Sequence, residues 1–177
     1  MPVQKDLLTI RLAAAENEAE NDAFRIFLKQ QDKEWIDSIV HRLNDEVTPQ
    51  IDCTQCGNCC RSLIIGVTGE ETVPVANHLQ ISVASFKQKY IEESEQGEMV
   101  MNTIPCHFLN GTICAVYEHR FEPCRDFPHL HKPNFTSRLF GTLMYYEICP
   151  IIFNVVEKLK VESGFNISGH NNILAGS

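Results

Sequence analysis

The sequence predicts an α+β fold that is mostly helical, and three observations support this prediction. Apolar residues recur at a spacing of three and four along several stretches, as in amphipathic helices. An Asn-Gly pair at residues 110–111 indicates a short β-hairpin. All eight cysteines lie between residues 53 and 149, among glycines and prolines that favour irregular loops. We expect an N-terminal helical segment over residues 1–50, a cysteine-cluster domain over residues 51–162 and a flexible tail over residues 163–177.

The N-terminal segment is expected to form the longest helical stretch, although the pattern of residues 1–19 is ambiguous. Asp32 can cap a new helix just before Trp35, so the stretch forms either one helix or two. Thr48-Pro49 should end it, because the residue before a proline is disfavoured in a helix. The apolar positions that define the spacing are Phe24, Phe27, Leu28, Trp35, Ile36, Ile39, Val40 and Leu43.

A short strand and further helices are expected after the first cysteines. Residues 63–67 are apolar, β-branched and bounded by turn formers, which predicts a buried strand. Thr68 and Glu71 have the spacing of a capping box. Pro74 conflicts with a helix that continues from Thr68, so a turn with a helix restarting at Pro74 is equally well supported. Ser82 is expected to cap another helix.

The β-hairpin is expected to turn at Asn110-Gly111. With a two-residue turn there, Cys106 faces the same side of the hairpin as Ala115, whereas Cys114 faces the same side as His107. Cys106 and Cys114 would then serve different sites, unless a bulge shifts one of them.

Two helices separated by a break are expected near the C-terminus. Thr136 or Ser137 should open the first, and the second should follow Pro150. The weakly charged stretch from residue 139 to residue 156 contains Glu147 and Pro150, so it does not resemble a membrane span.

Charge and the N-terminal residues narrow the classes of partner. The net charge of −8 argues against a sequence-independent grip on nucleic acid, which requires Lys and Arg to neutralise phosphates. A membrane surface is disfavoured as a partner too. Asp6 and Arg11 interrupt the apolar run that a secretory signal would need, so we expect a cytoplasmic protein.

The cysteines carry the strongest functional signal. In a reducing cytosol disulfides do not persist, and clustered thiols more often bind a metal ion or perform redox chemistry. The run at residues 53–60 contains two overlapping Cys-x-x-Cys pairs, a spacing that lets two thiolates reach one ion from a tight turn. We therefore predict a small metal-stapled domain that holds zinc or iron, with these metal ligands: Cys53, Cys56, Cys59, Cys60, Cys106, Cys114, Cys124 and Cys149.

Several alternatives remain open at this point. A disulfide framework would apply if the chain were exported. Because neighbouring side chains of an extended segment point to opposite faces, Cys59 and Cys60 should not serve one ion equally. Three arginines, Arg61, Arg120 and Arg125, lie near cysteines in the sequence and are candidates to stabilise thiolates.

Zinc and iron are both compatible with this spacing. Cys-x-x-Cys-x-x-Cys also opens a bacterial ferredoxin motif, whose last ligand is followed by proline, as Cys149 is here. In the ferredoxin motif three residues separate the third and fourth cysteines, whereas Cys60 follows Cys59 directly here. An iron-sulfur protein with a redox or enzymatic role is therefore the alternative to a zinc- or iron-chelating protein.

Side chains that could support catalysis are few. His129 and His131 would share one face of an extended segment and could form a ligand pair. Cys124, beside Arg125, could be a nucleophile with a lowered pKa, but the sequence contains no evident base for it. No nucleotide-binding glycine loop or His-Glu-x-x-His motif is present, so the sequence assigns no reaction.

The combined motifs resemble a known family. They occupy residues 53–60, 106–114, 117–120, 124–128 and 149–150. In these segments the chain resembles the YkgJ-type cysteine-cluster proteins, a Cys-x-x-Cys-x-x-Cys-Cys family described as zinc- or iron-chelating. One departure is Phe121, where the family usually has proline after the arginine that matches Arg120. The resemblance implies a cysteine-ligated metal ion but no defined reaction.

Overall fold

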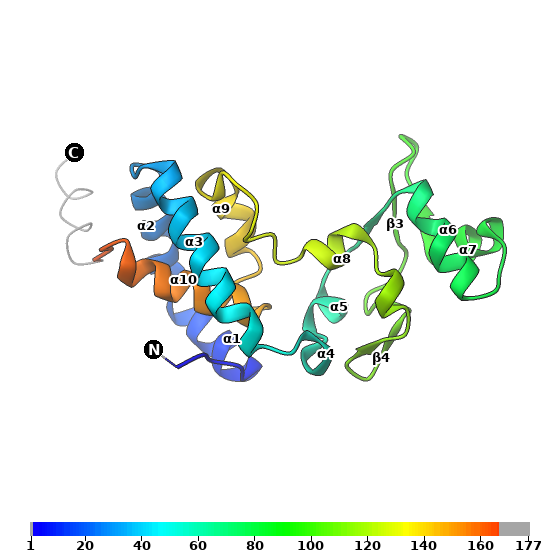
Figure 1. Ribbon diagram of the computed structural model, residues 1–177, viewed down its shortest axis with the longest axis horizontal. Helices are drawn as coiled ribbons and strands as arrows, with labels where there is room; N and C mark the ends of the chain where they lie inside the picture. Colours follow the sequence, from blue (N-terminus) through cyan, green and yellow to red (C-terminus); the bar gives the residue numbers. More distant parts are fainter. Residues whose placement is uncertain (1, 167–177) are drawn as a thin grey trace. The chain divides into compact units, whose positions relative to one another are not determined.

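The structure, a computed structural model, describes residues 2–166, and these divide into two compact units. Of the described residues, 2–52 and 128–166 belong to the first, which we call the helical unit, and residues 53–127 form the second, the cysteine unit. Each is described by itself below, with elements labelled as in Figure 1. The predicted mostly helical α+β class is confirmed.

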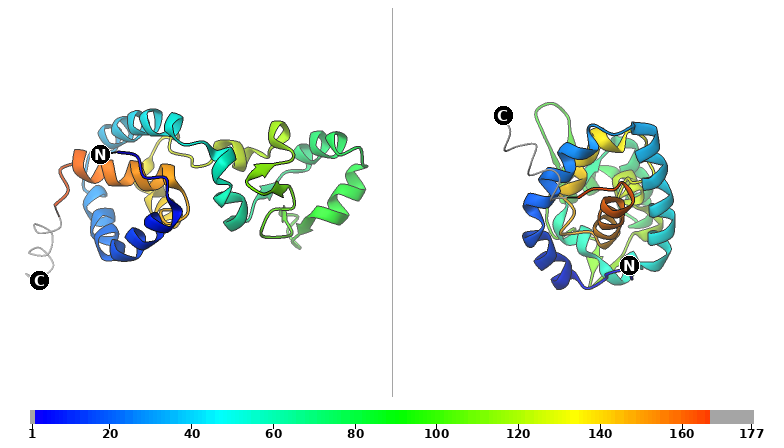
Figure 2. Two further views of the ribbon diagram at one scale, coloured as in Figure 1. Left: turned by 90° about the horizontal axis from the view of Figure 1, so that it is seen from below. Right: turned by 90° about the vertical axis from the view of Figure 1, so that its left-hand side faces the viewer.

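The helical unit is built around its last helix. Its elements are α1 (Leu7–Glu16), α2 (Glu18–Leu28), α3 (Lys33–Val47), the 3₁₀ turn η1 (Thr48–Gln50), α9 (Phe135–Leu143) and α10 (Pro150–Glu162). Helix α10 packs against α3 and α1, while α9 packs against α3 and α2 (Figures 1 and 2). Nearly all of α10 is buried, including Ile152, Val155, Val156 and Leu159, because it lies inside the other helices.

Local capping explains where the first helices begin. The carboxylate of Asp32 accepts the backbone N–H of Trp35 at 2.7 Å, so residues 18–47 form two helices, as one of the two sequence alternatives held. Asp6 caps α1 in the same way through the N–H of Thr9. The ambiguous N-terminal residues therefore include a capped helix.

Helix α9 begins earlier than predicted. It starts at Phe135 rather than at Thr136 or Ser137, and its N-cap, Asn134, makes no capping hydrogen bond with its own side chain. The cap is supplied by Asp37 of α3, which accepts the backbone N–H groups of Asn134 at 2.6 Å and Phe135 at 2.8 Å. A carboxylate so distant in the sequence cannot be recognised from the local pattern.

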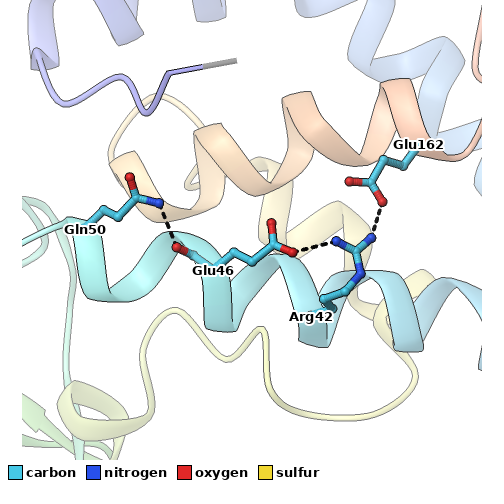
Figure 3. Close-up of polar contacts among 4 residues, drawn as sticks. All are labelled: Arg42, Glu46, Gln50 and Glu162. Atoms are coloured by element: carbon cyan, nitrogen blue, oxygen red, sulfur yellow. Dashed lines mark hydrogen bonds and ion pairs between the residues drawn. The ribbon is translucent and has the colours of Figure 1, made fainter.

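Polar side chains also connect α3 to α10 at the surface of the helical unit (Figure 3). Arg42 donates to Glu46 at 2.7 Å, one turn further along α3, and to Glu162 of α10. Gln50 donates to the carbonyl oxygen of Glu46 at 2.8 Å. These groups are about half exposed, so water screens the ion pairs and their contribution to stability is small.

The cysteine unit contains short helices and two small antiparallel sheets (Figure 1). Its elements are α4 (Cys53–Cys56), α5 (Asn58–Ser62), β1 (Gly66–Val67), α6 (Gly69–His78), α7 (Val83–Tyr90), β2 (Ile91–Glu93), β3 (Met99–Met101), β4 (Leu109–Asn110), β5 (Ile113–Cys114), η2 (Tyr117–His119) and α8 (Glu122–Asp126). The first sheet has the order β1-β3-β2, and the second is the hairpin β4-β5. An apolar core lies beneath them, made of Ile65, Val67, Val75, Ala76, Phe86, Met101, Phe108, Val116 and Phe121.

Two local predictions in this unit are confirmed and two need correction. The capping box of Thr68 and Glu71 opens α6, and Ser82 caps α7. Helix α6 continues through Pro74, so the alternative of a restart at that proline is wrong. The strand predicted over residues 63–67 is only two residues long, and Ile64 is 66% exposed.

The hairpin forms, but its register differs from the prediction. Asn110 pairs with Ile113 and Leu109 with Cys114, so the turn lies at Gly111-Thr112, one residue later than expected. Gly111 has a positive φ of 64°, which it adopts without steric cost. Cys106 precedes β4, and its carbonyl oxygen accepts the N–H of Leu109 at 3.0 Å. The argument that placed Cys106 and Cys114 on opposite faces of one hairpin therefore fails.

The C-terminal segment follows the expected order of helix, break and helix. Of the predicted tail, Phe165 packs against Phe24 with ring centroids 5.1 Å apart, and residues 167–177 lie outside the described residues. Among the described helices, none has the length and apolar character needed to cross a bilayer.

Candidate functional site

The structure places the predicted metal ligands unequally in the two units. Seven of the eight cysteines belong to the cysteine unit. The eighth, Cys149, belongs to the helical unit, where it is buried and forms the N-cap of α10. Its carbonyl oxygen accepts the N–H of Phe153 at 2.9 Å, the first turn of that helix.

The cysteine run folds as two short helices joined by a left-handed glycine. Gly57 has φ of +59°, and its N–H donates to the carbonyl oxygen of Cys53 at 3.1 Å, which closes the turn between α4 and α5. Its α-carbon lies against the hairpin turn: a methyl group there would come within 3.0 Å of Thr112 backbone atoms. Glycine is therefore required both by the backbone conformation and by the close approach.

Arg61 fastens this turn to the hairpin. Its Nη1 donates to the carbonyl oxygen of Cys56 at 2.9 Å, and its Nη2 donates to the carbonyl oxygen of Gly111 at 2.5 Å. The guanidinium thereby satisfies a carbonyl in each segment. The proximity to cysteine in the sequence indicated a role for Arg61, but its two carbonyl partners depend on the tertiary structure.

Four cysteines from separate segments lie near enough for the charge of one thiol to act on another. The N–H of Cys106 donates to the carbonyl oxygen of Cys60 at 2.8 Å, which joins α5 to the segment before β4. Three of the four side chains also pack against the core. We call the following set the four-thiol group: Cys60, Cys106, Cys114 and Cys124.

Charge effects within the four-thiol group show that its members are close in space. Burial raises the pKa of Cys124 to about 12, and negative charge on the other three thiols adds to this increase. Burial likewise raises the pKa of Cys106, with contributions from Cys60 and Cys114. The pKa of Cys114 is raised by burial and by the charge of Cys60. If all four thiols were ionised, their negative charges would repel one another. A bound cation would therefore be needed for the four thiolates to exist together.

Cys60 is the member of the group that ionises most easily. A hydrogen bond from the Cys59 side chain lowers the pKa of Cys60 to about 6, and the positive charges of Arg120 and Arg61 act in the same direction, against burial. The thiolate form therefore predominates at neutral pH. Cys59 and Cys60 have different surroundings: Cys60 belongs to the four-thiol group, and the Cys59 side chain hydrogen-bonds to it.

The remaining arginines have distinct positions. Arg120 donates from Nε to the carbonyl oxygen of Tyr117 at 2.9 Å, and its guanidinium carbon lies 3.5 Å from the centroid of the Tyr117 ring. Burial raises the pKa of both Cys114 and Cys124, and the charge of Arg120 opposes part of that rise. Arg125 donates to the carbonyl oxygen of Arg120, and its positive charge helps to lower the pKa of Glu71. Tyr117, which orients Arg120, was not identified as a functional residue from the sequence.

A polar pocket of about 500 Å³ has Arg120, whose charge acts on Cys60, in its wall. Glu71 projects into it from α6 and accepts the N–H of Glu122 at 2.5 Å, which connects α6 to the start of α8. The walls also contain Glu70, Glu118 and His119. Neither Glu71 nor the pocket had been singled out from the sequence as functional, because the carboxylates come from three separate elements.

Two other candidates are not supported by the structure. His129 has φ of +61°, so the segment from His129 to His131 is not extended and the expectation of two imidazoles on one extended face is wrong. The raised pKa of Cys124 is the opposite of what an activated nucleophile requires.

The chemistry of the four-thiol group suits a borderline or soft cation. Thiolates are preferred ligands of zinc and of iron in clusters, and the two arginines near Cys60 favour the ionised form. Over residues 2–166, however, no three Cys, His, Asp or Glu side chains converge tightly enough to hold an ion in their present rotamers. The donor type therefore fits a metal ion, and side-chain rotation would have to accompany its binding.

Comparison with known proteins adds one finding. The family model CxxCxxCC, described as "Putative zinc- or iron-chelating domain", matches residues 52–146, more than half of the chain. The matched range contains all the cysteines of the cysteine unit and ends before Cys149. No curated protein and no solved structure matches the chain.

Proposed function

The chain belongs to the CxxCxxCC family, and from that premise we propose that its cysteine unit binds one zinc or iron ion through the four-thiol group. The observation that supports the proposal is that, after burial, the charge of neighbouring thiols contributes to the raised pKa values of Cys106, Cys114 and Cys124. A divalent cation would remove the repulsion that raises those pKa values, because it neutralises the thiolates.

In this proposal the ion acts chiefly as a cross-link. The four ligands come from α5, the segment before β4, strand β5 and α8, so one ion would tie together four segments that share few backbone hydrogen bonds. Structural zinc contributes apparent folding free energy on the order of 10 kcal/mol, comparable to the stability of a whole domain. With four thiolate ligands its coordination would be complete, so the ion would stabilise the fold rather than activate a substrate.

The other cysteines are assigned supporting or separate roles. Cys59 would stabilise the Cys60 thiolate by hydrogen bonding, as outer partners of metal ligands do. We propose Cys53 and Cys56, the first and last residues of the single helical turn α4, as ligands for a second ion. Cys149 remains a ligand candidate on sequence grounds alone, and its substitution belongs in any mapping experiment.

The metal and its form can be identified from protein purified without oxygen. Metal analysis should find zinc or iron in stoichiometric amount, and sulfide analysis distinguishes single ions from an iron-sulfur cluster. Colourless protein with zinc and no sulfide would support the chelating function, whereas brown protein with sulfide would support the iron-sulfur alternative. Protein with neither metal and with its thiols blocked in disulfides would contradict both.

Serine substitutions then test the ligand set. Cys60→Ser, Cys114→Ser and Cys124→Ser should each lose the ion, because removing one of four thiolates opens its coordination. Cys53→Ser should retain the ion of the four-thiol group and lose only the second ion proposed above. Substitution by cobalt(II) gives a second readout, since thiolate coordination produces charge-transfer absorption. Retention of the ion in Cys60→Ser together with its loss in Cys53→Ser would overturn the grouping.

A further inference from the structure

A second pocket lies in the helical unit and is independent of the cysteines. It has a volume of about 480 Å³, within the range of small-molecule sites, and it is lined by the end of α1, by α2 and by α9 with the residues that follow α9. Every residue of its lining belongs to the helical unit. The proposed function makes no use of it.

One polar side chain in the wall of this pocket has an unused hydrogen-bonding atom. Asn21 is only 9% exposed. The hydroxyl group of Tyr146 donates to Glu157 at 2.6 Å, so its oxygen can only accept, and it accepts from Asn17 at 3.1 Å and from Asn21. The amide nitrogen of Asn21 must therefore face Tyr146. Within residues 2–166, no donor reaches the Oδ1 of Asn21.

An unused donor lies one helical turn further along α2. Residues four apart share a helix face, so Arg25 follows Asn21 on the side that lines the pocket. Its Nη2 lies 3.6 Å from Asp22, and its guanidinium lies 5.3 Å from the centroid of the Phe140 ring. The Nε of Arg25 is buried, and no acceptor in the described part of the chain reaches it. A buried donor and a buried acceptor each cost free energy until a partner arrives.

The rest of the lining defines the kind of molecule that fits. The apolar surface includes Phe140 and Met144, two large apolar residues that are 63% and 60% exposed. The rim carries three carboxylates, from Glu18, Asp22 and Glu147, which disfavour an anion. The guanidinium of Arg25 repels a cation placed beside its own Nε, which is where the unpaired donor lies.

From these features we propose that the pocket binds an uncharged ligand that carries a carboxamide on an apolar body. The N–H of the ligand donates to Oδ1 of Asn21, and its carbonyl oxygen accepts from Nε of Arg25. The apolar body packs against Phe140 and Met144. Both polar atoms are shielded from water in the free protein, so a small rotation of each side chain accompanies binding.

The proposal is tested with four probes that share one apolar ring: benzamide, N,N-dimethylbenzamide, benzylammonium and benzoate. Each is titrated into the full chain labelled with ¹⁵N, and the side-chain resonances of Asn21 and Arg25 are followed by NMR. Benzamide should bind best. Removing the N–H in N,N-dimethylbenzamide should weaken binding about tenfold, the effect of one buried hydrogen bond. Equal binding of the two amides, tighter binding of either ion, or no binding at millimolar benzamide would overturn the proposal.

A matched pair of variants assigns the effect to the pocket. Asn21→Ala and Asn17→Ala each remove one amide that donates to Tyr146, but only Asn21 lines the pocket. Asn21→Ala should weaken benzamide binding about tenfold, whereas Asn17→Ala should leave it unchanged. Arg25→Lys retains the charge without the Nε donor and should weaken binding similarly. Thermal unfolding of all three verifies that they fold, and equal affinities in Asn21→Ala and Asn17→Ala would overturn the assignment.

Discussion

Arg61 donates to the carbonyl oxygen of Gly111 at 2.5 Å, while the same guanidinium donates to the carbonyl oxygen of Cys56 at 2.9 Å. One side chain thus holds the cysteine run against the hairpin that contains Cys114. This bridge makes the position of the run dependent on the geometry of a planar cation, which a lysine ammonium cannot reproduce.

Arg61→Lys should therefore lower both the stability and the metal content of the protein. Losing a charge-assisted bridge to two carbonyls should cost about 1.5 to 3 kcal/mol. Urea unfolding and metal analysis measure the two effects. Arg11→Lys on the exposed face of α1 is the control and should change neither. A variant Arg61→Lys as stable as the control would show that the bridge is not required.

Gly57→Ala should destabilise the cysteine unit more than Gly97→Ala does. Both glycines have positive φ, at 59° and 81°, so both substitutions carry a conformational penalty of about 1 kcal/mol or more. Only at Gly57 does the new methyl group approach backbone atoms, at 3.0 Å, whereas it meets nothing within 4 Å at Gly97. Urea unfolding of the two variants isolates the cost of the close contact, and equal losses would contradict it.

Asp37→Ala should destabilise the helical unit by about 1 to 2 kcal/mol, as the loss of a helix cap typically does. Its carboxylate satisfies two N–H groups at the start of α9 that have no other side-chain cap. Asp45→Ala, on the exposed side of the same helix, is the control and should be nearly neutral. Hydrogen exchange at Asn134 and Phe135 localises the change, and unaltered protection there would refute the assignment.

Acidification should weaken the contact between α6 and α8 through Glu71. Burial raises the pKa of this carboxyl, but N–H groups of Glu122 and Thr68, the Thr68 hydroxyl and the charge of Arg125 outweigh burial and lower it below its usual 4.5. The stabilisation is therefore complete above the unfolded pKa of about 4.5 and is lost as the pH falls through the lower, folded value. In Glu71→Gln that acid-dependent loss should be absent. Unfolding free energies of both proteins between pH 7 and pH 3 measure the difference, and parallel curves would contradict the prediction.

Removal of the ion by a chelator should expose the backbone of the cysteine unit more than that of the helical unit. The cysteine unit has short elements and a small core, while α10 is buried along nearly its whole length. Hydrogen exchange measured by mass spectrometry should show lost protection within residues 53–127 and retained protection in α10. Uniform loss in both units, or no loss at all, would argue against a cross-linking ion.

Local features of the chain could be predicted from the sequence because each depends on residues a few positions apart. Asp32, Ser82 and the Thr68–Glu71 box begin helices where their side chains can reach N–H groups of the first turn. The cysteine run and its family were recognisable for the same reason, since the spacing of the motif is itself local.

The register of the hairpin and the start of α9 could not be predicted in this way. Asn-Gly favours a two-residue turn, yet the positive φ of Gly111 can serve the first position of a turn that begins one residue later. The pairing of Leu109 with Cys114 is then settled by packing against the core. At α9 the deciding group was Asp37, which belongs to another helix.

The sequence by itself determined the fold class, the helices with local caps and the cysteine family, because periodicity, capping and motif spacing are properties of neighbouring residues. Only the tertiary structure decided which thiols affect one another's pKa values. A backbone hydrogen bond joins Cys60 to Cys106, and Cys106, Cys114 and Cys124 pack against one core; both features depend on segments distant in the chain. The effect of one charge on another weakens with the distance between them. The thiols that affect the pKa of Cys124 are therefore those that the fold brings near it, and they are not its neighbours in the sequence.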